Sequence, residues 1–206
     1  MDIQVVKMLP KEKSKTEVCF DNGEKVLLYR GEIRKLSLHE GAYISSETYE
    51  QILWEIVGLR AKKRAMHLLE RMDRTESQLR QKLEQNGYPA VCVEAAIEYV
   101  KSYHYIDDAR YVENYIRYGQ EKKSRQRLQM DLYAKGVDRE VVAQAMEEVF
   151  CADEQQKIMT LLEKKHYDPE QSDRKEQQRI YQFLMRRGYR SSDISHAMRL
   201  WAEREA

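Results

Sequence analysis

The chain has 206 residues, 34% charged and 42% hydrophobic, enough for one large domain or two to three small modules. No window approaches the roughly 18 uninterrupted apolar residues of a membrane helix, and the first ten residues lack the apolar stretch of a secretory signal. The 36 basic and 35 acidic residues nearly cancel to a formal net charge of +1. The total charge alone therefore indicates no nucleic-acid partner.

The first 50 residues differ in pattern from the rest. Two apolar stretches, Thr16–Phe20 and Lys25–Tyr29, flank Asn22-Gly23, which is the strongest short signal for a β-hairpin. Residues 3–8 can add a strand, and residues 30–36 form a candidate short helix. We therefore predict a small β-containing N-terminal cap over residues 1–50.

A long helix is expected next. Ser45 or Ser46 is suited to its N-cap, and the apolar pattern continues from Glu47 to Met72. Gly58 lies inside this stretch and is its weak point, because glycine disfavours a helix interior. We expect one long or kinked helix here.

Three stretches then align without gaps, at residues 78–100, 127–149 and 179–201. Their glycines, Gly87, Gly136 and Gly188, are 49 and 52 residues apart. Apolar residues recur at helical spacing on both sides of each glycine, and glycine supplies the left-handed position that ends a helix. Each unit is preceded by another apolar periodic segment, at about 60–72, 108–119 and 154–165.

This recurrence predicts a mainly α protein with three tandem three-helix repeats of about 50 residues. We place repeat 1 at 51–107, repeat 2 at 108–152 and repeat 3 at 153–206. Such units bury their apolar faces internally and against neighbours, which favours an elongated, curved array. Local charge alternates along the chain, with +5 over 60–83, −4 over 84–116, +4 over 117–137, −6 over 138–173 and +5 over 174–190.

Residues suited to chemistry show no convincing pattern. Cys19, Cys92 and Cys151 are odd in number and far apart, so they form neither a disulfide framework nor a zinc site, and a reducing cytoplasm is expected. We expect Cys92 and Cys151 to be small core residues. Asp107-Asp108 is better explained as a helix start than as a metal site. We therefore expect no enzyme activity, no metal and no cofactor.

Tyrosines cluster where repeat 1 passes into repeat 2. We interpret them as packing residues at that seam, with a base-stacking platform as the alternative. These residues are Tyr99, Tyr103, Tyr105, Tyr111, Tyr115 and Tyr118.

Basic residues near the middle helix of each unit are the better functional candidates. A solvated helix face is the ordinary explanation for such runs, but a basic stripe also suits phosphate backbones or an acidic protein groove. The candidate filament- or DNA-binding residues are Arg74, Arg80, Lys82, Lys122, Lys123, Arg125, Arg127, Lys135, Arg186 and Arg187.

Three ordered motifs resemble the RecX family. Residues 64–83 resemble its opening repeat, Tyr105-Ile-Asp-Asp-Ala-Arg-Tyr111 is similar to its Tyr-Leu-Asp-Asp-x-Arg-Phe motif, and Leu132-Tyr-Ala-Lys-Gly-Val137 is similar to its Leu-x-x-Lys-Gly-Ile motif. The resemblance spans about 60–201. Repeat 3 departs from it, because Arg186-Arg-Gly188 replaces Lys-Gly and the loop at 166–173 is longer.

The resemblance implies a regulator of the RecA recombinase without catalytic residues of its own. Members bind the RecA–single-stranded DNA filament, lie in its groove, and reduce ATP hydrolysis and strand exchange during recombination and DNA repair. It implies RecA filaments as the partner, weak binding to single-stranded DNA with duplex DNA as a further candidate ligand, and no membrane; we expect a monomer. Two alternatives stay open: a stand-alone helical DNA-binding protein, and a general helical protein-interaction scaffold.

Overall fold

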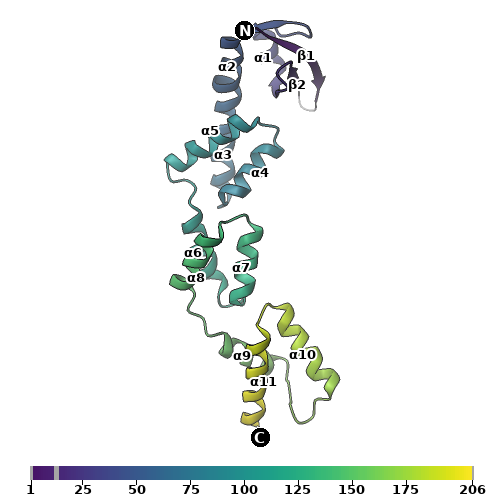
Figure 1. Cartoon of the computed structure of the whole chain (residues 1–206), viewed down its shortest axis with the longest axis vertical. Helices are drawn as coiled ribbons and strands as arrows, with labels where there is room; N and C mark the ends of the chain where they lie inside the picture. The colour runs from purple at the N-terminus through teal and green to yellow at the C-terminus, as the bar shows by residue number, and fades with distance from the viewer. Residues whose placement is uncertain (1, 12–13, 206) are drawn as a thin grey trace. The chain divides into compact units, whose positions relative to one another are not determined.

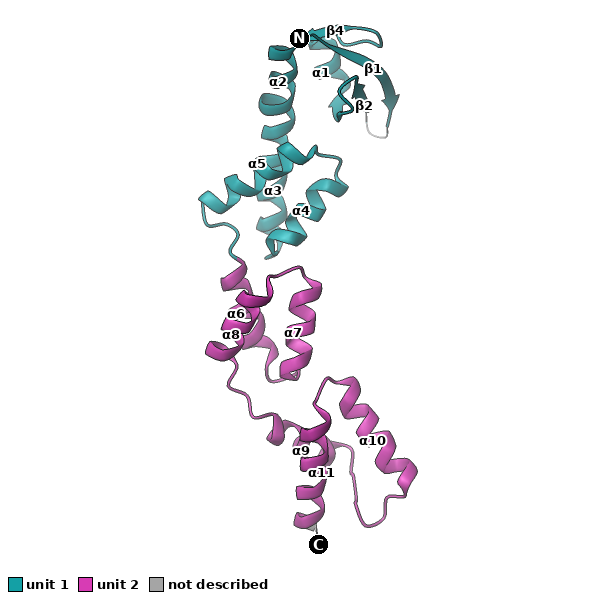
Figure 2. Ribbon diagram, viewed as in Figure 1, with its two compact units in different colours: residues 1–107 teal, residues 108–206 magenta. Residues whose placement is uncertain are grey.

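The computed structural model describes residues 2–11 and 14–205 and divides into two compact units, residues 1–107 and 108–206 (Figure 2). The first unit begins with a four-stranded antiparallel sheet of order β3-β2-β1-β4. Its strands are β1 (Asp2–Pro10), β2 (Lys15–Phe20), β3 (Lys25–Tyr29) and β4 (Tyr43–Ser45).

The predicted hairpin is present between β2 and β3. At its turn, the Asn22 side-chain oxygen accepts the Glu24 N–H at 3.0 Å, and Gly23 takes a φ of 84°. Val18 and Val26 are paired across the two strands and both are buried, as expected from the alternation of apolar residues along a half-buried strand. The predicted β-containing cap is therefore confirmed, whereas strand β4 was not expected.

The long helix is also present, and Ser45 caps it by accepting the Thr48 N–H at 3.1 Å. It runs through α2 (Ser46–Gln51), a π-helical segment η1 (Ile52–Gly58) and α3 (Leu59–Arg71). The irregularity expected at Gly58 is this wider π turn, which ends at that glycine. A Cβ at position 58 would lie 3.0 Å from the Leu53 carbonyl oxygen, so the absent side chain leaves room for the π turn.

The first unit has one continuous core that joins the sheet to repeat 1. The short helix α1 (Arg30–Lys35) follows β3 directly, as predicted. The Arg60 guanidinium on α3 donates a hydrogen bond of 3.0 Å to the Leu27 carbonyl of β3. Since β3 is an edge strand, this contact satisfies one of its open backbone groups.

Three three-helix repeats follow one another, as predicted (Figure 1). Repeat 1 consists of α3, α4 (Glu76–Gln85) and α5 (Ala90–Ser102). Repeat 2 consists of α6 (Asp108–Gly119), α7 (Arg125–Ala134) and α8 (Arg139–Val149). Repeat 3 consists of α9 (Glu154–Lys164), α10 (Arg174–Arg186) and α11 (Ser191–Glu205).

The aligned positions of the repeats have the same role in each. Leu83, Leu132 and Leu184, four residues before each glycine, are all fully buried. The three glycines have φ values of 80°, 76° and 85° and close the turn between the second and third helices. Repeats 2 and 3 each have their own buried cluster, so the predicted mainly α fold of three helical repeats with a small β-containing cap is confirmed. The elongated, curved arrangement stays a prediction.

Two further helices end in the left-handed conformation at histidine. His104 after α5 and His166 after α9 have φ values of 55° and 50°. After α9, His166 donates its backbone N–H to the Glu163 carbonyl and Tyr167 donates to the Leu162 carbonyl, which is the Schellman pattern. These histidines therefore stop helices as the repeat glycines do.

Candidate functional site

The start of α7 is the centre of the contact between repeats 2 and 3. Ser124 is the N-cap and is only 1% exposed. Its hydroxyl accepts the Arg127 N–H at 3.1 Å and donates to the Arg187 carbonyl at 3.0 Å. A Cβ on Gly188 would lie 2.7 Å from the Ser124 oxygen, so glycine gives this turn both its positive φ and its close approach.

Two side chains of α9 complete this contact. Lys157 Nζ donates to the carbonyl oxygens of Gln120 and Lys123, at 2.5 and 2.9 Å, in the loop between α6 and α7. Glu154 accepts the Arg125 backbone N–H at 2.7 Å. Burial lowers the pKa of the Lys157 ammonium, because desolvation disfavours its charged form. Repeat 3 therefore fixes the loop that carries the predicted basic run 122–127.

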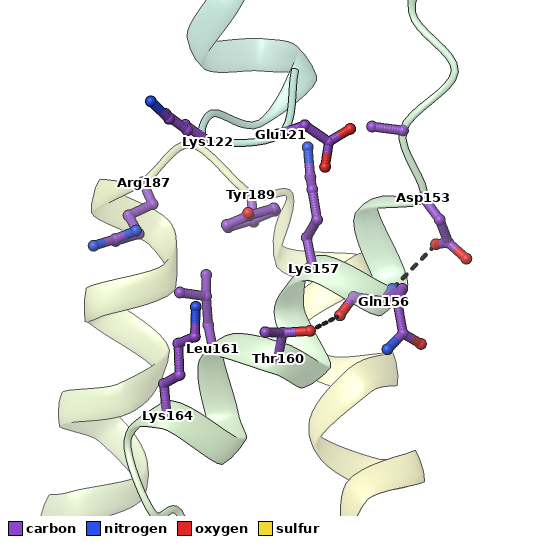
Figure 3. Close-up of a pocket in the computed structure, with 11 residues that line it drawn as sticks. Glu121, Lys122, Asp153, Gln156, Lys157, Thr160, Leu161, Lys164, Arg187 and Tyr189 are labelled. Carbon is purple, nitrogen blue, oxygen red and sulfur yellow. Dashed lines mark hydrogen bonds between the residues drawn. The ribbon is translucent and has the colours of Figure 1, made fainter. Parts of the chain in front are cut away.

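A cleft of about 480 Å³ opens beside this contact (Figure 3). In the view of Figure 3, the basic side chains of Lys122, Arg187 and Lys164 lie along one side, and Asp153 lies on the other. The Asp153 carboxylate already accepts the backbone N–H groups of Gln155 and Gln156 as the cap of α9. The remaining lining residues are Glu121, Ala152, Gln156, Lys157, Thr160, Leu161 and Tyr189.

The basic side of the cleft has groups that can bind an anion. Lys122, Lys164 and Arg187 have no ion-pair partner within residues 2–11 and 14–205, and all three are exposed. The Arg187 guanidinium lies 4.7 Å from the centre of the Phe183 ring, a cation–π contact that holds the group at the surface. Phosphate or carboxylate oxygens are the natural partners of such donors.

Several predicted site residues are instead held by acidic side chains. Lys123 and Arg127 both contact the Asp131 carboxylate, at 2.8 and 3.0 Å. Arg125 pairs with Glu147, and Arg80 pairs with Glu94 and, at 3.0 Å, with Glu76. A part of the positive charge counted from the sequence is therefore neutralised within the fold.

The other predicted residues have varied surroundings. Lys82 and Arg186 are exposed, and the Lys82 ammonium donates to the Gln85 side chain at 3.1 Å. Lys135 lies 5.3 Å from the centre of the Tyr115 ring. Arg74 is half-buried, and its Nε is a buried donor that has no hydrogen-bond acceptor among the residues the structure describes. The structure thus brings Lys122 and Arg187 to one cleft, whereas Arg74, Arg80 and Lys82 belong to the other unit.

The Asp131 carboxylate contacts three side chains of repeat 2: Lys123, Arg127 and Tyr115. Burial alone would raise the pKa of this carboxyl, but hydrogen bonds from Lys123 and Tyr115, with the nearby Arg127 charge, hold the pKa below its usual value. The hydrogen bond to Asp131 is in turn the main cause of the raised pKa of Lys123. This cluster orders the surface that carries the basic run.

Lys157 and Lys164 were not predicted as site residues from the sequence. Both lie in the stretch 138–173, whose net charge of −6 concealed them. The spacing of Lys157 and Lys164, seven residues apart on α9, was the available signal, because residues at this spacing share one helix face.

The cysteines and tyrosines only partly follow the predictions. Cys92 is buried, and burial raises its pKa to about 11, as suits a small core residue; Cys151, however, is exposed just beyond α8, and its core placement was wrong. Tyr99, Tyr111 and Tyr115 are packing residues, partly buried against the cores of their own units, while packing at the seam between repeats 1 and 2 stays a prediction.

The predicted packing role is wrong for three other tyrosines, which are more than half exposed. These are Tyr103, Tyr105 and Tyr118.

Residues 2–11 and 14–205 contain neither a candidate metal site nor a candidate membrane span. They contain no group of three or more His, Cys, Asp or Glu side chains that could hold a metal ion. Within the same residues, no helix has the length and apolar character needed to cross a membrane.

Known proteins match this chain over most of its length. Family models of the first, second and third three-helix domains of RecX match residues 61–99, 107–146 and 152–198. The regulatory protein RecX of Caldanaerobacter subterraneus subsp. tengcongensis is 28% identical over 203 residues, which cover 95% of this chain and 98% of that protein. The regulatory protein RecX of Vibrio parahaemolyticus is 34% identical over 145 residues, covering 68% of this chain and 90% of that protein.

Solved structures have the same fold. A crystal structure of regulatory protein RecX superimposes with a TM-score of 0.62 at 21% identity, covering 95% of this chain and 98% of that one. A crystal structure of RecX from Lactobacillus salivarius gives a TM-score of 0.59 at 22% identity, covering 69% of this chain and 95% of that one. With all three domain models matched in order along the repeats, the chain belongs to the RecX family.

Proposed function

We propose that this protein is a non-enzymatic regulator of RecA that binds the RecA–single-stranded DNA filament and inhibits its ATPase and strand exchange. Its membership of a family whose curated relatives are named regulatory proteins carries this proposal. The three repeats, placed at 51–107, 108–152 and 153–206, act as successive contact modules. The protein works in the cytoplasm as a monomer and modulates recombination and DNA repair.

The cleft of repeats 2 and 3 supplies the first contact surface. Lys122, Lys164 and Arg187 present donors that are not neutralised by an acidic partner within the described residues. Such groups bind backbone phosphates or the acidic side chains of a protein groove. Arg186, which is also exposed, adds positive charge in repeat 3, and the exposed Lys82 adds positive charge in repeat 1.

The ion-paired bases have a different role in this proposal. Because Asp131 orients Lys123 and Arg127, and Glu147 orients Arg125, these side chains are ordered before binding. Ordered groups lose less conformational entropy when a partner arrives. They shape the contact surface and make secondary contacts, while the cleft residues carry most of the charge-dependent affinity.

Binding to RecA-coated and to bare single-stranded DNA tests both the proposed partner and the proposed cleft residues. We expect fluorescence anisotropy to show tighter binding to the coated strand, and we expect Lys122→Glu/Lys164→Glu/Arg187→Glu to weaken it by about tenfold or more, which is about 1.4 kcal/mol. The matched control is Lys7→Glu/Lys25→Glu/Arg34→Glu, which reverses three charges in the N-terminal cap and should bind as the unmodified protein does.

The possible failures are distinguishable. Equal and salt-steep affinity for coated and bare strands would support a stand-alone DNA-binding protein instead. Binding to neither strand would favour a general interaction scaffold. Unchanged binding by the folded cleft variant would remove these three residues from the proposal but leave the role of the protein intact.

A further inference from the structure

Three tyrosine rings form a ladder at the end of α5. The Tyr99 and Tyr103 rings have centroids 5.0 Å apart with planes at 57°. The Tyr103 and Tyr105 rings have centroids 5.9 Å apart, and their planes are only 20° from parallel. All three belong to the first unit.

The helix end creates this arrangement. Tyr103 is the C-cap of α5, and His104 follows it in the left-handed conformation. The backbone N–H groups of His104 and Tyr105 donate to the carbonyls of Lys101 and Val100, both at 2.9 Å, which completes a Schellman motif. The chain reversal brings two rings, two residues apart, to the same side, and the backbone hydrogen bonds hold them there.

Packing does not account for the outer two rings. Tyr103 is 58% exposed and Tyr105 is 51% exposed, so each presents a large apolar surface to water. The stacked pair Tyr111–Tyr115 in repeat 2 provides an internal comparison. Those rings are partly buried, and the Tyr115 hydroxyl contacts Asp131 at 3.1 Å and Lys123 at 2.8 Å. The repeat 2 pair is thus held by the core and polar contacts of its own repeat.

Positive charge lies beside the inner ring of the ladder. The Lys62 ammonium on α3 lies 5.3 Å from the centre of the Tyr99 ring, and the neighbouring Lys63 is exposed. Lys101, on the last turn of α5, pairs with Glu76 at 2.9 Å. Aromatic faces next to ammonium groups are the combination used to bind single-stranded nucleic acid, because bases stack while cations contact phosphates.

We propose that Tyr103 and Tyr105, backed by Tyr99 with Lys62 beside its ring, form a stacking platform for unpaired bases of single-stranded DNA. This inference rests on the proposed function. It adds that repeat 1 contacts the bases of the DNA strand. Stacking on tyrosine is tolerant of sequence, because every base has a π face. The platform therefore favours exposed, unstacked bases over duplex DNA, whose bases are stacked internally.

The test compares two strands of equal charge. An oligo-dT strand and an abasic strand of the same length have the same phosphates, but only the first has bases. We expect this protein to bind oligo-dT about five- to tenfold more tightly, which is about 1.0–1.4 kcal/mol, because its bases stack on the two exposed rings. Tyr103→Ala/Tyr105→Ala should lose this preference and leave binding to the abasic strand unchanged.

Matched variants separate stacking from other causes. Tyr103→Trp/Tyr105→Trp should keep or increase the preference, because the aromatic faces remain. Tyr118→Ala removes a tyrosine that is 83% exposed but lies outside the ladder, and it should behave as the unmodified protein. Since the rings of Tyr103 and Tyr105 are mostly in water, these variants should unfold at the same temperature as the parent protein.

The results also distinguish this inference from the proposed function. Equal binding to both strands, or an undiminished preference in the double alanine variant, would overturn the platform. The double alanine variant should in addition inhibit RecA less than the parent protein. If the unmodified protein does not inhibit RecA at all, the proposed function is contradicted, whatever the strand comparison shows.

Discussion

The Ser124 hydroxyl donates a hydrogen bond of 3.0 Å to the Arg187 carbonyl, although the two residues are 63 positions apart in the chain. The same hydroxyl caps α7 by accepting the Arg127 N–H. One buried oxygen atom therefore serves a helix start in repeat 2 and a helix end in repeat 3. The two repeats are joined at the residues that carry much of the basic surface.

Ser124→Ala should uncouple this junction. The substitution removes the cap and takes away the donor to the Arg187 carbonyl, so we expect a loss of about 1–2 kcal/mol in the free energy of unfolding. Urea unfolding measures the loss, and hydrogen exchange should show faster exchange in the turn at Gly188. Ser192→Ala, at an exposed serine of α11, should leave both measurements unchanged.

Gly188→Ala should be more harmful than the same change at another left-handed glycine. Both Gly188 and Gly23 have a φ near 85°, but a Cβ at 188 would contact Ser124 and Arg127, whereas at 23 it would meet nothing within 4 Å. Gly23→Ala should therefore cost only the conformational penalty, about 1–2 kcal/mol, and Gly188→Ala more than this. Equal losses in thermal unfolding would show that the close approach at 188 has no energetic weight.

His166→Gly should stabilise the protein. His166 has a φ of 50°, and this left-handed conformation costs a residue with a side chain about 1–2 kcal/mol. Glycine avoids that strain, but its larger unfolded-state entropy offsets part of the gain. We expect a net gain of up to about 1 kcal/mol in urea unfolding. A loss of stability would mean that the imidazole makes contacts worth more than the backbone strain.

Asp131 predicts a specific dependence on pH. Its folded-state pKa lies below the usual value, so its contribution to stability is present above the unfolded pKa of about 4 and is lost as pH falls through the folded pKa. At pH 7, Asp131→Asn should be less stable by about 1–3 kcal/mol. The difference should shrink below pH 4, and a difference that stays constant to pH 2 would exclude ionisation as its source.

The repeats were predictable because their signals are local. Helical spacing places Leu83, Leu132 and Leu184 in the cores, and glycine is the residue that most often takes the left-handed position at a helix end. The helix ends at His104 and His166 were missed for the complementary reason, since histidine at a left-handed position is decided by the surrounding turn. Strand β4 has only three residues, and its pairing with β1 is a tertiary contact.

The candidate site was harder to predict. Charge runs along the sequence identified Lys122 and Arg187, but they could not show that Asp131 and Glu147 would engage Lys123, Arg127 and Arg125. Arg125–Glu147 joins two helices and Lys123–Asp131 joins a loop to α7, so both depend on packing. Arg127–Asp131, in contrast, has the i, i+4 spacing of neighbours on one helix. Lys157 could not be predicted either, because it lies in an acidic stretch of the sequence and yet joins repeat 3 to the loop before α7.

The rate of ATP hydrolysis by RecA on single-stranded DNA is the most direct test of the central claim. The measurement is made on preformed filaments while this protein is added in increasing amounts. We predict that the rate falls progressively and that added salt, which screens charged contacts, weakens the effect. An unchanged rate, with the protein shown to be folded and present in excess over RecA, would contradict the account.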